Sequence, residues 1–195
     1  MALYVRDCYD CFEHKCSEDR VECLCVRIRG KANGADVVVG VYCRPPTQDR
    51  EVDEIFYMHI GDISRSLVLV FVGDFNFPDI CWKYSTAEQD QAWRFLGYVG
   101  DNFLTQLVRE PTREGALLDL LFVNREGLVD DVEVGGRLGH SDHEIVEFSI
   151  LREARRGLSR TDILDFQRAD FDLFEHVLDR IPWEMVLKDI GIQEG

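Results

Sequence analysis

The sequence has 195 residues, of which 22 are basic and 37 acidic, so its formal net charge is −15. This length suits one ordinary domain, with or without a tail, and excludes two full enzymes. The acidic balance argues against a protein that holds nucleic acid mainly through a basic surface. We find neither a signal peptide nor a run of the ~20 apolar residues that a membrane span needs, and we expect a nuclear or cytoplasmic protein with no membrane partner.

The first part of the chain predicts three strands. Apolar residues alternate or cluster at 2–6, 21–29 and 36–43, as they do in strands. Asn33-Gly34 is a typical turn signal and predicts a hairpin between the second and third strands. The prolines of Arg44-Pro45-Pro46 then end the third strand, because proline cannot donate a ladder hydrogen bond.

The next hundred residues alternate between helix and strand patterns. Helical spacing of apolar side chains predicts amphipathic helices at 51–66 and 88–99. The apolar run 67–72, which ends at Gly73, is typical of a strand buried on both faces. Further strands are expected at 103–108, 117–123, 129–134 and 145–151.

A change in character after Leu151 marks the predicted domain boundary. Residues 152–157 are polar and linker-like, and 170–180 has the pattern of a short helix with Asp170 as its cap. We therefore divide the chain into a folded domain at 1–151 and a linker-like helical segment at 152–195.

The cysteines are concentrated near the start of the chain, with five of the seven in the first 25 residues. Because no secretory leader is found, reduced thiols are expected. A zinc site made from Cys8, Cys11, Cys23 and Cys25 is one hypothesis. The second pair is spaced too closely for the usual zinc knuckle and lies in a strand-like run, but the sequence leaves this alternative open.

Asp74 and Asn76 directly follow the buried strand at 67–72. Residues i and i+2 of an extended chain point to the same side, so a carboxylate and an amide are presented together at the rim of a sheet. This pair suits a phosphate oxygen or a metal-bound water. The alternative is that both residues only make the turn after the strand.

Two further polar features stand near predicted strands: Asp142-His143 before 145–151, and Asp119 inside the apolar run 117–123. An Asp-His pair can supply a metal-linked carboxylate and a general base, although a polar surface turn reads the same way. A charge among apolar residues is costly unless it is paired. We therefore expect Asp119 to orient His143, as in a catalytic triad, unless Asp119 points to solvent from a one-sided strand.

Four motifs together carry a resemblance to a known family. Their order and spacing resemble the exonuclease–endonuclease–phosphatase superfamily and, within it, the apurinic-endonuclease-like domain of LINE (non-LTR) retrotransposons. The resemblance covers roughly residues 2–151, and the tail through Pro182-Trp183 resembles the segment that leads to a reverse transcriptase. The motifs are Arg44-Pro45-Pro46, GDFNFPDICW from Gly73 to Trp82, Glu110-Pro-Thr-Arg113 and Gly139-His-Ser-Asp-His143.

The resemblance implies an α/β (α+β) fold in which two packed sheets form a sandwich flanked by helices, with the site at one rim. It implies a hydrolase that cuts DNA phosphodiester bonds with Mg²⁺ or Mn²⁺ and leaves a 3′ hydroxyl that primes the reverse transcriptase. It further implies roles for six residues: Asp74, Asn76, Asp119 and His143 in catalysis, Asp74 and Asp142 at the metal, and Asn76, Thr112 and His143 in substrate binding.

The chain departs from the family pattern in two ways. Two early family motifs, one of which carries the principal metal-binding Glu, precede the region matched here, and Glu22 stands next to a different strand. We therefore expect the domain to lack its first strands and to bind a metal weakly, if at all. The family Tyr aligns with Cys43, and Tyr42 is displaced by one position, which on a strand turns a side chain to the opposite face.

The principal functional hypothesis is a metal-dependent DNA endonuclease that is impaired by the missing motifs. The alternative is a catalytically inactive relic of the same domain, which is either inert or kept as an interaction module. A phosphomonoesterase of the same superfamily is a third hypothesis, which the LINE-like motifs disfavour. Missing strands would also leave unpaired sheet edges and exposed apolar faces.

Overall fold

The computed structural model describes residues 1–15, 20–30 and 34–151. The linker and the helix expected within 152–195 lie outside these ranges, and so does Asn33 of the predicted turn. Neither helix in the described part of the chain has the length and apolar character needed to cross a membrane.

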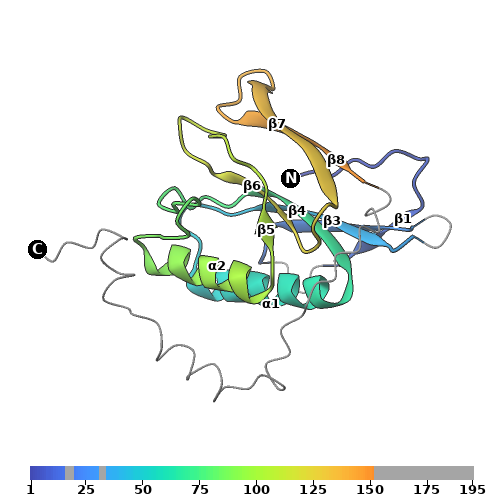
Figure 1. Cartoon of the computed structure of the whole chain (residues 1–195), viewed down its shortest axis with the longest axis horizontal. Coiled ribbons are helices and arrows are strands. Elements are labelled where there is room, and N and C mark those ends of the chain that lie inside the picture. Colours follow the sequence, from blue (N-terminus) through green and yellow to red (C-terminus); the bar gives the residue numbers. More distant parts are fainter. Residues whose placement is uncertain (16–19, 31–33, 152–195) are drawn as a thin grey trace, which may run out of the picture. The chain divides into compact units, whose positions relative to one another are not determined.

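A mixed six-stranded sheet forms the centre of the fold (Figure 1). Across the sheet the strands lie in the order β1 (Cys11–His14), β2 (Cys23–Ile28), β3 (Val37–Cys43), β4 (Val68–Asp74), β6 (Asp119–Val123) and β5 (Thr105–Gln106). β3 and β4 are parallel, and the other neighbouring strands are antiparallel.

Two helices cover one face of this sheet. α1 (Arg50–Ser66) connects the parallel strands β3 and β4, which cannot be joined by a tight turn, and α2 (Asp90–Asp101) lies beside it (Figure 1). The space between helices and sheet is filled mainly by aromatic rings. Phe56 of α1, Phe71 of β4 and Phe95 of α2 are each at most 2% exposed in this core.

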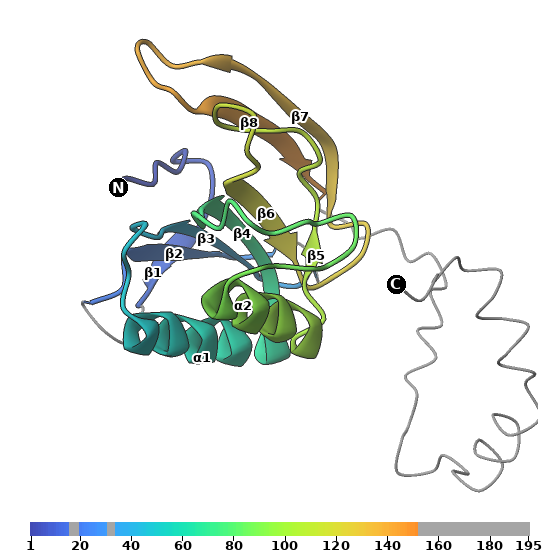
Figure 2. The same cartoon turned by 90° about the vertical axis from the view of Figure 1, so that its left-hand side faces the viewer.

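A two-stranded hairpin made of β7 (Val129–Arg137) and β8 (Glu144–Ile150) lies on the opposite face of the sheet (Figure 2). Successive residues of a strand point to opposite faces. Phe71 of β4 therefore faces the helices, whereas Val70 belongs to a second apolar cluster with Leu121, against which the hairpin packs. The strand alternation thus decides which side chains reach each face.

Both predicted helices are confirmed, and eight strands lie within the described residues. The strand expected at 2–6 is wrong, because no strand forms there and Tyr4 is 93% exposed. β1 was not predicted; its four residues are too few for a clear alternation, and the strand exists through its pairing with β2. The strand expected at 103–108 is reduced to the two residues of β5.

The expected α/β class with two sheets is confirmed, but the arrangement is less symmetrical than a sandwich flanked by helices. Both helices lie on the same face of the central sheet, and the second sheet has two strands. Leu24 of β2, which alternation places on the face opposite the helices, is 37% exposed.

Candidate active site

Three polar side chains leave the central sheet in one row at the end of β4. Cys43 pairs with Asp74 across β3 and β4, and Asp74 pairs with Asp119 across β4 and β6. Residues that are directly opposite each other in a sheet point to the same face. A thiol and two carboxylates thus lie side by side on the face that carries the hairpin.

The backbone after β4 holds the Asp74 carboxylate in place. A Cβ on Gly73 would overlap the carbonyl oxygen of Tyr42, so the close approach of β3 requires glycine here. Asn76 has a φ of 52°, and its amide donates a hydrogen bond to Asp74 Oδ1 at 3.0 Å. The neighbours Phe75 and Phe77 are buried in the core and anchor this turn. Asp74 and Asn76 therefore make the turn and are presented at the rim together.

The His143 imidazole lies between three carboxylates. Its Nδ1 is 2.9 Å from Asp119 Oδ2, and its Nε2 is 4.0 Å from Asp74 Oδ2 and 3.9 Å from Asp142 Oδ1. A hydrogen bond from Nδ1–H to Asp119 leaves Nε2 as the nitrogen that faces the rim. The structure thus brings together four of the six residues named from the sequence, and Asn76 stands beside them through Asp74.

Thr112 lies beneath this group and is fully buried. Its Oγ1 accepts hydrogen bonds from the amides of Leu118 and Asp119, at 3.2 and 2.9 Å, and its carbonyl oxygen accepts one from Glu144 at 2.7 Å. These bonds join the start of β6 to the start of β8. The geometry therefore supports a positioning role for Thr112, because it ties the strand of Asp119 to the strand that follows His143.

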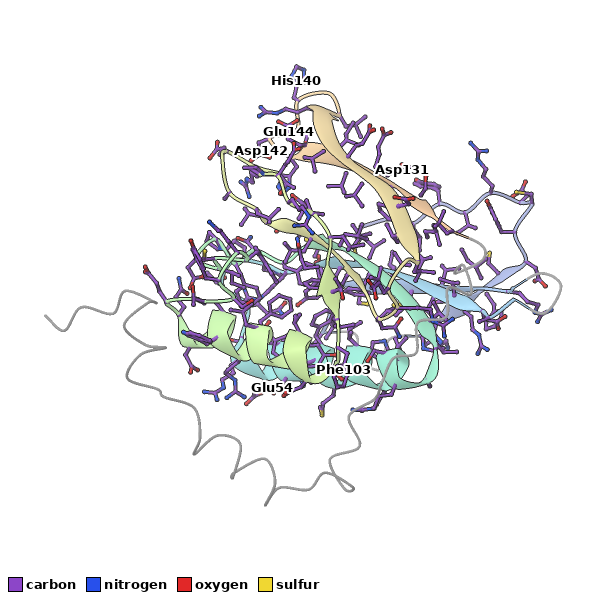
Figure 3. All side chains as sticks on the ribbon, viewed as in Figure 1. Glu54, Phe103, Asp131, His140, Asp142 and Glu144 are labelled. Carbon is purple, nitrogen blue, oxygen red and sulfur yellow. The ribbon has the colours of Figure 1, made fainter. Side chains whose placement is uncertain are left out.

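A guanidinium group that the sequence reasoning missed lies at the site. Arg113 Nε is 2.7 Å from Asp142 Oδ2, and both side chains are partly or fully exposed. A backbone hydrogen bond at Asp142 and the Arg113 charge hold the pKa of the Asp142 carboxyl below its ordinary value. His140, two residues before Asp142, is exposed and points away from it (Figure 3). The Glu-Pro-Thr-Arg motif contained this signal, since Arg113 directly follows Thr112.

The environment of Asp74 disfavours its charged form. Burial and the neighbouring charge of Asp119 raise the pKa of Asp74, and the His143 ring opposes this shift. Asp74 and His143 are 18% and 28% exposed, respectively, so the group remains open to a ligand. Carboxylates that crowd together in this way are a common arrangement at functional sites, because a bound cation relieves their repulsion.

Glu22 extends the row by one strand. Its carbonyl oxygen accepts a hydrogen bond from the Cys43 amide at 3.1 Å, so the two residues are neighbours at the ends of β2 and β3. Burial, the Asp74 charge and the Glu22 charge together raise the pKa of the Cys43 thiol. The sequence reasoning set Glu22 aside because it precedes a different strand, but sheet pairing brings that strand next to β3.

Tyr42 lies on the other face of the sheet, as its one-position displacement predicts. Its ring is 1% exposed and stacks on Phe56 with a centroid distance of 3.7 Å. Its hydroxyl accepts a hydrogen bond from Gln48 Nε2 at 2.8 Å, and burial raises its pKa. Cys43, and not Tyr42, is therefore the side chain that β3 contributes to the candidate site.

Two comparisons with known proteins relate this arrangement to a family. The family model described as endonuclease-reverse transcriptase matches residues 37–147. The fold is similar to that of the endonuclease domain of TRAS1, a telomere-specific non-LTR retrotransposon. That similarity has a TM-score of 0.57 at 20% identity, and it covers 73% of this chain and 67% of that domain.

Two further solved structures were found with TM-scores below 0.5. A mannosyl-6-phosphatase of Bacteroides thetaiotaomicron gives a TM-score of 0.45 at 16% identity over 66% of this chain and 56% of that one. The human Nocturnin catalytic domain gives 0.41 at 14% identity over 72% and 60%. No curated protein matches this sequence. Because the family match spans more than half of the chain and includes Asp74, Asp119 and His143, this protein belongs to the endonuclease-reverse transcriptase family of the exonuclease–endonuclease–phosphatase superfamily.

Proposed function

We propose that this chain is a divalent-metal-dependent endonuclease domain that hydrolyses phosphodiester bonds in DNA and acts with a reverse transcriptase. The observation that carries the proposal is the His143 imidazole, which contacts Asp119 through Nδ1 and faces Asp74 and Asp142 with Nε2. Family membership supports DNA as the substrate.

Asp119 and His143 act as a pair in this proposal. Asp119 accepts the Nδ1–H hydrogen bond and so selects the tautomer and the orientation of the ring. Nε2 then contacts the scissile phosphate or exchanges a proton with it. Because the Asp119 carboxylate also stabilises a protonated ring, the pair suits a step in which charge develops on the phosphate oxygens.

Asp74 and Asn76 handle the attacking water. Without a bound cation, burial and the Asp119 charge raise the pKa of Asp74, which favours its acting as a base. It accepts a proton from the water as the water oxygen bonds to phosphorus, and the bond to the 3′ oxygen breaks. The departing 3′ oxygen takes up a proton from solvent and becomes the hydroxyl that a reverse transcriptase extends.

The rim carboxylates are of the ligand type that Mg²⁺ and Mn²⁺ prefer, although among the described residues no three of their ligand atoms lie within 4.8 Å of one another. Asp74 and Asp142 would hold the cation, and Glu22 offers a further carboxylate beside Cys43. When bound, the cation supplies positive charge to the phosphate oxygens. Arg113, which contacts Asp142, adds a second positive group at the same place.

The test is nicking of supercoiled plasmid by the purified 195-residue chain with and without Mg²⁺. We expect nicking that requires the metal and falls by at least about 100-fold in His143→Ala and in Asp74→Ala, the usual range for loss of a general acid or base. His140→Ala is the matched control, because His140 is an exposed histidine of the same loop and should leave the rate unchanged.

Circular dichroism of each variant accompanies the assay. A folded parent that does not nick DNA even at high Mg²⁺ would contradict the proposal and favour the inactive relic. That alternative rests on a specific observation, since Cys43 stands where the family pattern has tyrosine and Tyr42 is buried on the opposite face. Turnover of a phosphomonoester without nicking would instead favour a phosphatase.

A further inference from the structure

A cluster of metal-binding side chains lies in the helix-facing core, on the opposite face of the sheet from the candidate active site. Cys23, Cys25 and His59 each offer one ligand atom, and these three atoms lie within 4.8 Å of one another. No other group of three or more such residues in the described part of the chain meets this criterion. The proposed endonuclease reaction uses none of the three residues.

The positions of the two cysteines follow from the sheet. Cys23 and Cys25 are residues i and i+2 of β2, so both side chains leave the strand on the same face. They are 9% and 2% exposed, and their sulfur atoms are 3.5 Å apart. Two sulfurs at the usual 2.3 Å from a tetrahedral zinc ion lie about 3.8 Å apart, so the observed separation is close to that of a zinc site.

His59 supplies a nitrogen from the opposite layer of the core. It lies on α1, and its Nε2 atom is buried without a hydrogen-bond partner among the described residues. A buried polar atom with no partner carries a desolvation cost that a bound ligand removes. One of the two His59 ring nitrogens lies within 4.8 Å of both sulfurs, so a metal ion between the three residues would contact this ring.

His14 is the candidate for the fourth ligand, although its ring nitrogens lie outside the group of atoms that are within 4.8 Å of one another. It pairs with Cys25 in the β1–β2 register, so the two side chains leave the sheet on the same face. The centroids of the His14 and His59 rings are 6.2 Å apart. Gly40 pairs with Cys25 on the other side, and a Cβ there would come within 3.0 Å of the Cys25 sulfur. The absence of a side chain at Gly40 leaves room for the sulfur.

We propose that Cys23, Cys25 and His59 bind a zinc ion that ties β2 to α1, with His14 as the fourth ligand. Thiolate and imidazole ligands select zinc over the hard cations that suit the carboxylates of the active site. Two thiolates balance the charge of one Zn²⁺ ion, so the buried site is neutral when the histidines are neutral. This set differs from the sequence hypothesis, because Cys8 and Cys11 are not part of the cluster.

The test is a cobalt titration of the full chain, prepared metal-free under reducing conditions and shown by circular dichroism to be folded. We expect one Co²⁺ per chain, with the intense visible bands of a tetrahedral thiolate site, and displacement of Co²⁺ by an equivalent of Zn²⁺. Excess Mg²⁺ should not displace it, which separates this site from the carboxylate rim. A folded, reduced chain that gives no tetrahedral cobalt spectrum would overturn the proposal.

Single substitutions identify which residues bind the metal ion. Cys25→Ser should weaken Co²⁺ binding by at least tenfold and reduce the thiolate absorption, because only the Cys23 thiolate remains. His59→Gln should weaken binding by at least tenfold with the thiolate bands retained. Cys81→Ser is the matched control, because Cys81 is an exposed cysteine outside the cluster and should bind Co²⁺ like the parent. Unchanged affinity in His59→Gln would overturn the proposal.

Thermal unfolding provides a readout that does not depend on cobalt. Zinc should raise the Tm of the parent by several degrees, since a ligand that binds the native state stabilises it, and should not raise that of His59→Gln. His59 is only half-buried, so this variant is expected to fold even if Cys25→Ser does not. A Cys23–Cys25 disulfide found by mass spectrometry in the reduced preparation would also overturn the proposal.

Discussion

The two faces of the central sheet are built differently, although the same strands contribute to both. The helix face is closed by α1 and α2, and aromatic rings such as Phe56, Phe71 and Phe95 fill it. The hairpin face is covered over β4 and β6, and at the ends of its strands stand the polar groups Cys43, Asp74 and Asp119.

The helix face therefore contributes mainly to stability, and the hairpin face carries the groups that can take part in a reaction. On the helix face, large side chains are buried among other apolar groups, which is the usual source of folding free energy. On the hairpin face, like charges are held close together, which costs folding free energy and suits a cation or a phosphate. Substitutions on the helix face should therefore lower stability, whereas substitutions of the polar residues on the hairpin face should lower activity with little loss of stability.

The largest effect on stability is expected in the aromatic core. Phe56→Ala should lower the free energy of unfolding by about 3–5 kcal/mol, because it removes a fully buried ring that stacks on Tyr42. Leu24→Ala, on the exposed part of the hairpin face, should cost less than about 1 kcal/mol. Urea unfolding measures both, and equal losses would contradict the division between the faces.

A buried ion pair supports the helix face at the edge nearest the site. Arg44 and Asp53 are each about 3% exposed and form two hydrogen bonds of 2.9 and 3.0 Å. Arg44→Met should cost about 3–5 kcal/mol, because it leaves the Asp53 carboxylate buried without its cation. Arg65→Met, whose partner Asp62 is exposed, is the control and should change stability by less than about 1 kcal/mol.

Substitution of a polar residue on the hairpin face should reduce activity. Asp119→Asn should reduce plasmid nicking by about 100-fold, because the amide no longer selects the His143 tautomer that presents Nε2 to the rim. Its stability should change far less than that of Phe56→Ala. If Asp119→Asn lowered the free energy of unfolding as much as Phe56→Ala, Asp119 would instead belong to the stabilising core.

The raised pKa of Asp74 predicts a smaller, stabilising effect when this residue is replaced. The native pKa lies above the ordinary 3.8, so ionisation of Asp74 costs folding free energy, and this cost develops as the pH rises from 3.8 through the native pKa. Asp74→Asn should therefore be inactive yet more stable than the parent at neutral pH. The gain should disappear below pH 3.8, as urea unfolding at several pH values would reveal.

The smallest expected change concerns the residue that departs from the family pattern. Cys43→Tyr places a phenol next to Asp74, where the family resemblance expects one, and should raise the nicking rate severalfold.

Tyr42→Phe on the helix face removes the hydrogen bond from Gln48, so it should lower the free energy of unfolding by about 1 kcal/mol and leave nicking unchanged. A Tyr42→Phe variant that loses activity would contradict the assignment of Tyr42 to the core.

Local patterns predicted the parts of this molecule that depend on nearby residues. Helical spacing found α1 and α2, and the apolar run before Gly73 found β4. The contact between Asp119 and His143 could also be expected, because a carboxylate inside an apolar strand needs a partner.

Features that depend on which segments meet in space could not be predicted in this way. Glu22 lies beside Cys43 because β2 pairs with β3, and no local pattern near Glu22 indicates that neighbour. His59 meets Cys23 and Cys25 because α1 crosses beneath β2, which follows from the crossover geometry and not from cysteine spacing.

The central claim is that Asp119 acts through His143, and a double-mutant cycle on plasmid nicking tests it most directly. Asp119→Asn is measured in the parent and in the His143→Ala background, with each variant shown to be folded. We predict a loss of about 100-fold in the parent and almost no further loss once His143 is absent. Equal losses in both backgrounds would contradict the account, because Asp119 would then contribute independently of the imidazole it contacts.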